Sequence, residues 1–284
     1  MSLRAGLEQW ARRTGVRLVL LDDGSSPERA AAAHAELVER GCRIVLGPYG
    51  SDCVRAVAKT GALVWNHGGA ADDVQRLPGV VSVPTPASRY LVALGRAVAE
   101  LRPGAKVAVL AAPGDFARLA REGFEREAAS LGLGHVPDPD EADAVFLCGP
   151  VEWERERFDR LAGRGVLLGG VSPGLASVPG SAAWPNGTLA PAQWHPDVRV
   201  KAEIGPNSVP LEDYVAAQAY AAVLIAEHCL ELDPDDPHAA ARALRTTTFF
   251  GAFELDETGL QRGHRLPVVR WQDGRRELFL AEAA

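Results

Sequence analysis

The chain has 284 residues, with 30 Lys and Arg against 37 Asp and Glu, for a net charge of −7 at pH 7. Charges of both signs are scattered along the chain, which excludes nucleic acid as an expected partner. No apolar run approaches the roughly 20 residues needed to span a bilayer. The length suits two α/β lobes better than two large independent domains.

The first hundred residues alternate helices and strands. Apolar residues at helical spacing predict an opening helix that ends at Gly15, and residues 16–21 are typical of a buried strand. Ser26 caps a second predicted helix, residues 27–40, and Pro27 is its first residue. A strand at 43–46, a helix at 51–60 and a strand at 62–65 follow. This alternation predicts a parallel sheet.

A second copy of the pattern begins after residue 104. Strands are predicted at 106–110, 144–148 and 166–168, with helices near 116–131 and 152–163. Charges on the 152–160 helix indicate a solvated face. Residues 173–191 are rich in Gly, Pro, Ser and Ala and predict a loop that leads into a crossing segment, 188–193.

The last quarter of the chain changes period. A long helix with a buried stripe from Tyr214 to Cys229 and a shorter helix near 237–245 come first. Strands and turns are then predicted within 251–280.

These elements predict an α/β fold of two Rossmann-like lobes with parallel sheets, joined by a three-crossing hinge. Lobe I is predicted to comprise residues 1–104 and 190–250, and lobe II residues 105–189 and 251–284. In such sheets ligands bind at the carboxyl ends of the strands, so the expected site lies in the cleft between the lobes.

Several stretches, in order along the chain, resemble one family. They are residues 18–30, RIVLGPYGS at 43–51, YVAAQAYAA at 214–222, FGAF at 250–253, DETG at 256–259 and QRGH at 261–264. Together they resemble the type I periplasmic binding proteins, in the leucine/isoleucine/valine-binding branch that serves ABC importers of branched-chain amino acids. The resemblance implies a solute bound in the cleft, an ABC permease as partner, no enzymatic activity and no cofactor.

The chain departs from that family in two ways. Family members begin with a strand that lies centrally in the first sheet, and no such strand precedes the opening helix here. An unpaired central edge favours strand exchange or a homodimer. Amino-acid binders use a hydroxyl residue and an acidic residue where this chain has HGGA at 67–70 and GGVS at 169–172. Because a desolvated ammonium needs a carboxylate, an organic acid, in particular an aromatic one, is favoured over an ordinary amino acid.

Two stretches are the main site candidates. Ser51 and Asp52 open a helix after a strand, where backbone N–H groups suit a carboxylate; a plain helix cap is the alternative. In residues 65–69, two glycines would let amides approach an anion, with amide, imidazole and indole side chains beside them; core packing is the alternative. The predicted ligand-binding residues are Tyr49, Ser51, Asp52, Trp65, Asn66, His67, Gly68, Gly69, Ala70, Phe116, Pro150 and Ser172, with Tyr90, Cys148 and Gln193 bordering the cleft.

No catalytic or metal site is predicted. The chain lacks GxSxG, HExxH, GxxxxGK and a GxGxxG after a strand, and its four cysteines, read as buried free thiols, lack zinc spacing. The acidic pairs at 22–23 and 72–73 are typical of caps.

The leading interpretation is a solute-binding component of an ABC importer. The alternatives are a ligand-sensing regulatory domain of the same fold and a degenerate structural remnant, with a hydrolase or transferase least favoured. A removed signal peptide would place the protein in the periplasm or at the cell surface, and otherwise the cytoplasm is expected.

Overall fold

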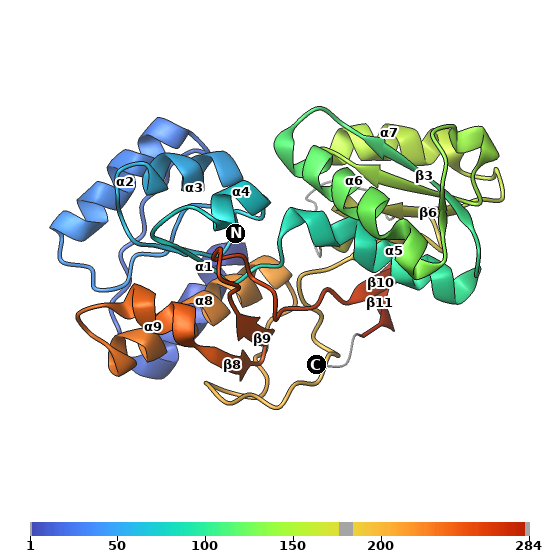
Figure 1. Ribbon diagram of the computed structural model, residues 1–284. Coiled ribbons are helices and arrows are strands. Elements are labelled where there is room, and N and C mark those ends of the chain that lie inside the picture. The colour runs from blue at the N-terminus through green and yellow to red at the C-terminus, as the bar shows by residue number, and fades with distance from the viewer. Residues whose placement is uncertain (1, 176–183, 282–284) are drawn as a thin grey trace. The chain divides into compact units, whose positions relative to one another are not determined.

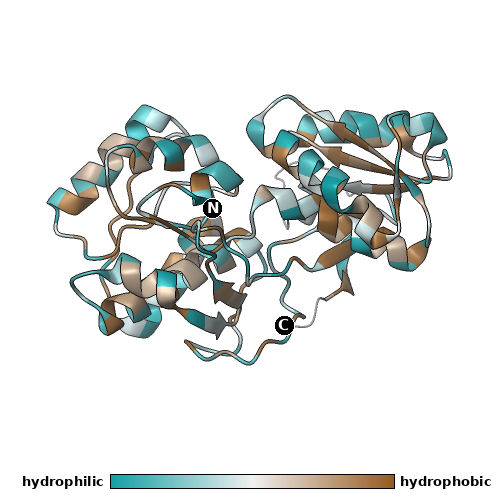
Figure 2. Cartoon of the chain, in the orientation of Figure 1, coloured by the Kyte–Doolittle hydropathy of each residue, from teal (hydrophilic) through white to brown (hydrophobic). Residues whose placement is uncertain are grey.

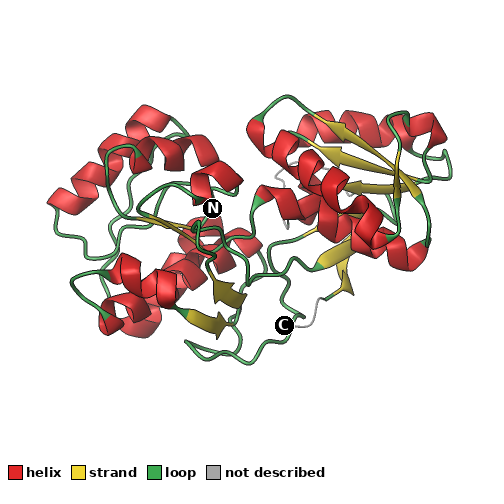
Figure 3. Cartoon of the chain, in the orientation of Figure 1, coloured by secondary structure: helices red, strands yellow, loops and turns green. Residues whose placement is uncertain are grey.

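The computed structural model describes residues 2–175 and 184–281, which form a mixed α/β protein (Figure 3). The chain divides into two compact units. Unit 1 consists of Met1–Pro86 and Arg199–Arg265, and unit 2 of Ala87–Val198 and Leu266–Ala283. The chain therefore passes between the units three times, which agrees with the predicted three crossings.

Unit 1 is built around one long buried helix. The helices of this unit are α1 (Ser2–Thr14), α2 (Pro27–Glu39), α3 (Ser51–Ala58), α4 (Asp72–Gln75), α8 (Tyr214–Leu232) and α9 (Pro237–Ala243). Its strands are β1 (Val64–Asn66) and β2 (Val80–Ser82), which pair in parallel, and β8 (Arg245–Thr248) and β9 (Gly251–Glu254), which pair antiparallel.

Helix α8 packs closely against α1 (Figure 1). Gly6 of α1 lies against the α8 backbone, where an added Cβ would be 2.0 Å from the Ala216 carbonyl oxygen. The Trp10 indole N–H donates to Glu227 at 2.8 Å. By length and composition α8 could cross a membrane, but 67% of its most apolar window is buried inside the structure. The apolar residues of α8 are therefore explained by its position in the core of unit 1.

The predicted strand at 16–21 is not formed. Residues 16–23 carry no ladder pairing, and the Val16 and Leu20 side chains are 45% and 43% exposed. In the predicted strand at 43–46, Leu46 makes a single parallel bridge to Trp65. A strand needs a hydrogen-bonded partner, and the residues that the structure describes supply none beside 16–21. The first sheet accordingly has fewer strands than the sequence pattern indicates.

Unit 2 contains a seven-stranded sheet in the order β11-β10-β7-β6-β5-β3-β4. Its strands are β3 (Lys106–Ala111), β4 (Gly134–His135), β5 (Ala144–Cys148), β6 (Leu167–Gly170), β7 (Leu189–Pro191), β10 (Val268–Gln272) and β11 (Arg275–Leu280). Neighbouring strands from β7 to β4 are parallel, and β10 and β11 join antiparallel. The helical segments are η1 (Ala87–Arg89), α5 (Tyr90–Leu101), α6 (Asp115–Glu127), η2 (Ala128–Leu131), η3 (Pro139–Glu141), α7 (Val151–Leu161) and η4 (Ser172–Gly174).

Both faces of this sheet are covered. Phe124 of α6 packs edge-on against Phe146 of β5, whereas Phe158 of α7 joins Val145 and Leu147 in a cluster on the other face. Every residue of β5 is buried, as expected for a central parallel strand. Figure 2 shows apolar strands inside unit 2 and hydrophilic outer faces on α6 and α7.

The divisions between units differ from those predicted after residues 104, 189 and 250. Helix α5 belongs to unit 2 because it packs on α6, β5 and β7. Strand β9 and the turns after it belong to unit 1 because β9 pairs with β8. Of the predicted 173–191 loop, residues 176–183 lie outside the described residues, and 189–191 form β7.

Replacing Phe124 with alanine should lower the free energy of unfolding of unit 2 by about 3–5 kcal/mol, because the buried ring leaves a cavity against Phe146. Urea unfolding followed by circular dichroism measures the loss. The control is Leu101→Ala in the same unit, where the side chain is 42% exposed and a change within about 0.5 kcal/mol is expected. Equal losses in the two variants would contradict the described packing.

Candidate functional site

In unit 2, the loops that follow four parallel strands meet at one edge of the sheet. Phe116 follows β3, Pro150 follows β5, Ser172 follows β6 and Gln193 follows β7. Helix α5 begins at the same edge with Tyr90. The carboxyl ends of parallel strands are the usual place for a ligand in an open α/β sheet.

Three of these side chains form an aromatic corner, defined here as Tyr90, Phe116 and Gln193. The Phe116 ring stands edge-on to Tyr90, with ring centroids 5.1 Å apart and planes at 82°. The Gln193 side-chain amide donates to the Tyr90 hydroxyl. Phe116 is half-buried, so its side chain is only partly covered.

The loops of Pro150 and Ser172 are joined by a buried carboxylate that the sequence analysis missed. Glu154 of α7 is 0% exposed, whereas charges on this helix were predicted to be solvated. Its Oε1 accepts the Gly149 N–H and its Oε2 accepts the Ser172 N–H, both at 2.9 Å. Burial raises the pKa of Glu154 to about 8, opposed by these hydrogen bonds. Glu154 shares its stripe with Phe158 and Leu161, and that spacing was the available sequence signal.

In unit 1, the loop after β1 is closed by the Asn66 side chain. Its Oδ1 accepts the N–H groups of Gly68 and Gly69, at 3.1 and 2.7 Å. Its Nδ2 donates to the Gly69 carbonyl at 2.7 Å and to the Ser82 hydroxyl at 2.8 Å. The two glycine amides that were expected to approach an anion therefore donate to Asn66, and Asn66 holds the loop.

His67 is the buried polar side chain of this loop without a protein partner. The imidazole is 1% exposed, and neither ring nitrogen has a hydrogen-bond partner among the described residues. Burial lowers the pKa of His67 to about 4, so the ring is neutral at pH 7. The exposed Tyr49 ring lies 6.3 Å from the imidazole and rests on Gly68, where an added Cβ would be 2.4 Å from the tyrosine ring.

The start of α3 is tied to this loop. Gly50 N–H donates to the Gly68 carbonyl at 3.3 Å, and Ser51 Oγ accepts the Ala71 N–H at 3.1 Å. Gly50 is the N-cap and offers no side-chain cap, so the first-turn N–H groups lie beside Ser51. The structure thus brings Tyr49, Ser51 and His67 together.

Three other predicted residues of unit 1 are close in sequence to this group but have surface or core environments. Asp52 is exposed and pairs with Arg55 at 2.6 Å, and the same arginine pairs with Asp73. Trp65 is buried in β1 opposite Val81, and Ala70 is buried in the loop after β1. Asp52 is a surface charge, and Trp65 is a core residue.

A second buried histidine, also missed from the sequence, lies next to two crossings. His264 Nδ1 is 2.5 Å from the Thr85 hydroxyl, and Nε2 is 3.1 Å from the Phe250 carbonyl oxygen. Its ring stacks on Phe250 with centroids 4.4 Å apart. Unit 1 ends at Pro86 before one crossing and at Arg265 before another, so Thr85 and His264 are each the second-to-last residue before a crossing.

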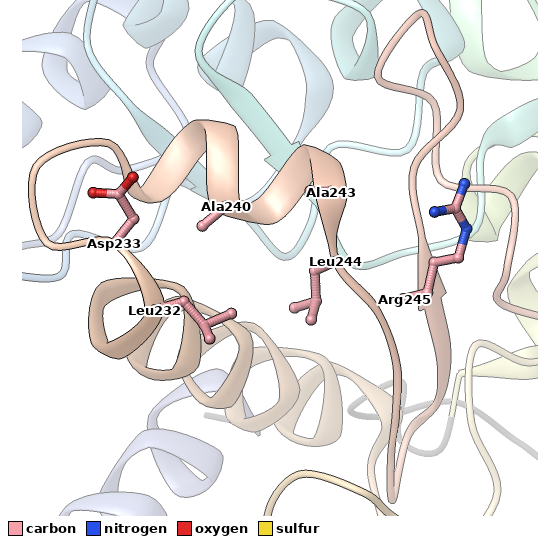
Figure 4. A pocket seen from close by; sticks show the side chains of 6 residues that line it. All are labelled: Leu232, Asp233, Ala240, Ala243, Leu244 and Arg245. Atoms are coloured by element: carbon pink, nitrogen blue, oxygen red, sulfur yellow. The ribbon is translucent and has the colours of Figure 1, made fainter.

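A hollow of about 500 Å³ lies where α8 and α9 meet (Figure 4). Leu232, Ala240, Ala243 and Leu244 line it, with Asp233 and Arg245 at its ends. None of the predicted ligand-binding residues contributes to it. Among the residues that the structure describes, no group of three His, Cys, Asp or Glu side chains could hold a metal ion.

A model of the family described as "Periplasmic binding protein" matches residues 2–144, half of the chain. No curated protein sequence matches. Solved structures give 442 matching chains.

Three of these structures illustrate the likeness. An ABC transporter substrate-binding protein from Desulfitobacterium hafniense in complex with Leu has a TM-score of 0.78 at 17% identity, over 98% of this chain and 95% of that one. A solute-binding protein from R. palustris in complex with 4-hydroxybenzoate has a TM-score of 0.74 at 17% identity, over 99% and 91%. The leucine-binding protein LivK of Thermotoga maritima has a TM-score of 0.74 at 15% identity, over 98% and 93%. At these identities the likeness establishes the fold.

Lowering the pH from 6.5 toward 4 should destabilise unit 1 through His67. In this window the unfolded histidine, with its ordinary pKa of 6.5, binds a proton that the folded one, with a pKa of about 4, does not. One such group removes up to about 3 kcal/mol of stability across the window. In His67→Gln the fall in urea stability between pH 7 and pH 5 should be smaller, whereas the control His228→Gln should keep the wild-type fall. An unchanged pH dependence in His67→Gln would contradict a buried neutral ring.

Proposed function

The chain belongs to the periplasmic binding protein family, and from this premise we propose that it is the substrate-binding component of an ABC importer. The family match, together with loops gathered at the carboxyl ends of parallel strands, is the observation that carries the proposal. The partner of the loaded protein would be an ABC permease. Its location would be outside the cytoplasm, where importers collect their solutes.

Each unit contributes one half-site in this proposal. In unit 1 it consists of Tyr49, Ser51 and His67 around the start of α3, where N–H groups and a neutral imidazole suit a carboxylate or hydroxyl. In unit 2 it is the aromatic corner, Tyr90, Phe116 and Gln193, which suits a flat apolar body.

The charges of these residues favour an organic acid as the solute. An α-ammonium group taken out of water needs a carboxylate. Asp52 is exposed and engaged by Arg55, and Glu154 is buried beneath backbone N–H groups, so neither is placed as that partner. The similar structures contain both 4-hydroxybenzoate and leucine, and the side chains of this chain favour the aromatic acid.

A thermal-shift screen of benzoate, hydroxybenzoates, leucine and dicarboxylates should give a rise in Tm for an aromatic acid. A ligand at about 100 times its Kd stabilises the folded state by about 2.7 kcal/mol. For a chain of this size, this corresponds to a shift of roughly 5–10 °C. Absence of a shift with every compound would contradict the proposed function, and a shift with leucine alone would contradict the solute class.

The shift should become smaller in Ser51→Ala and in His67→Gln. The control Ser130→Ala alters an exposed serine whose hydroxyl donates to the Glu127 carbonyl, and it should respond like wild type. Asn66 is unsuitable for this test, because its removal would leave two loop N–H groups without an acceptor.

We also propose that the unpaired segment 16–21 promotes association with a second copy of the chain. Its exposed Val16 and Leu20 and its unpaired backbone are a template for strand pairing. Light scattering over a concentration series should show dimers of the wild-type protein. The fraction of dimer should be smaller in the double variant Val16→Lys/Leu20→Lys. A monomer at every concentration would contradict this.

A further inference from the structure

Glu154 is a fully buried acid that connects two loops of unit 2. Its oxygens accept backbone N–H groups from Gly149, which follows β5, and from Ser172, which follows β6. The Ser172 hydroxyl donates to the Gly149 carbonyl at 3.3 Å, which is a second link between the same loops. The described contacts of this carboxylate are thus made by groups that belong to the two loops.

The surrounding residues leave room for the carboxylate. An added Cβ at Gly170 would lie 2.8 Å from Glu154 Oε2 and 2.8 Å from the Phe158 ring. An added Cβ at Gly149 would meet the Trp153 ring at 2.7 Å and the Ala112 Cβ at 2.8 Å. Glycine at position 170 therefore leaves room for the carboxyl group, and glycine at position 149 leaves room for Trp153 and Ala112.

The ionisable side chains next to Glu154 have other contacts. The guanidinium of Arg155 stacks over Trp184 at 4.3 Å, and that of Arg157 over Trp153 at 3.7 Å. On β5, burial raises the pKa of the Cys148 thiol, which leaves it neutral beside the carboxylate. The N–H groups of the two loops are therefore the described hydrogen-bond partners of the acid.

We propose that Glu154 is a positioning residue whose carboxyl group fixes the loops of Pro150 and Ser172, at the same sheet edge as the aromatic corner of the unit 2 half-site. The inference rests on the proposed function for its effect on solute binding, whereas its effect on the loops does not. Preformed loops reduce the ordering cost of binding, so loosened loops should weaken it.

The test compares Glu154→Gln with the matched control Glu152→Gln on the exposed face of the same helix. Glutamine keeps the shape but has one acceptor oxygen, so one of the two N–H groups loses its partner. In full-length protein labelled with ¹⁵N-glycine and ¹⁵N-serine, the amides of Gly149 and Ser172 should exchange with solvent about tenfold faster or more in Glu154→Gln. Their proton resonances should move upfield, while the amides of Gly95 in α5 and Gly123 in α6, which carry the same label, remain unchanged.

Solute binding is measured in the same variants with benzoate and 4-hydroxybenzoate as probes. Affinity should fall about 5- to 20-fold in Glu154→Gln and stay at the wild-type value in Glu152→Gln, a change of about 1–2 kcal/mol. Unchanged exchange of the two amides would overturn the inference. Altered exchange with unchanged affinity would overturn the positioning role in binding. If wild type binds neither probe, the aromatic-acid proposal fails, and the amide data still decide whether Glu154 sets the loops.

Discussion

The buried backbone groups of the loops that follow the strands impose the main constraint on this protein. A buried N–H without an acceptor costs about 1–3 kcal/mol, so each such group in these loops needs an acceptor. In unit 1 the Asn66 side chain accepts two such groups, and in unit 2 the Glu154 carboxylate does the same. In each unit, one polar side chain holds a loop that carries candidate site residues.

This arrangement explains where glycine occurs. An added Cβ at Gly69 would lie 2.9 Å from Val54 and 3.1 Å from Asn66 Oδ1, and one at Gly170 would meet Glu154. A loop can be held tightly by a side chain when its backbone can come close to that side chain. The glycines that suggested an anion site in the sequence therefore serve loop closure, and among the described residues the imidazole of His67 has no hydrogen-bond partner.

The sequence predicted most of unit 2 and less of unit 1, for physical reasons. Strands β3 and β5 are short apolar runs between turn residues, and their pattern is local. The predicted strand at 16–21 has the same local pattern but no partner, and pairing is not a local property. Asn66 closes its own loop by local contacts, but its side chain is also held by Ser82, sixteen positions away, which the loop sequence does not indicate. Glu154 could have been found, because an acid on the Phe158 and Leu161 stripe of a helix must be buried.

Two of the three crossings leave unit 1 next to one cluster of buried hydrogen bonds. Thr85 and His264 are joined within unit 1, the Gln75 amide donates to the Pro84 carbonyl at 3.0 Å, and the Gln261 amide donates to the Val83 carbonyl at 3.3 Å. These side chains are buried, so moving the segments 83–85 and 261–264 apart would break several hydrogen bonds away from water. Two of the three crossings therefore start from one fixed cluster. The chain leaves unit 1 directly after this cluster in both cases, at 86–87 and at 265–266.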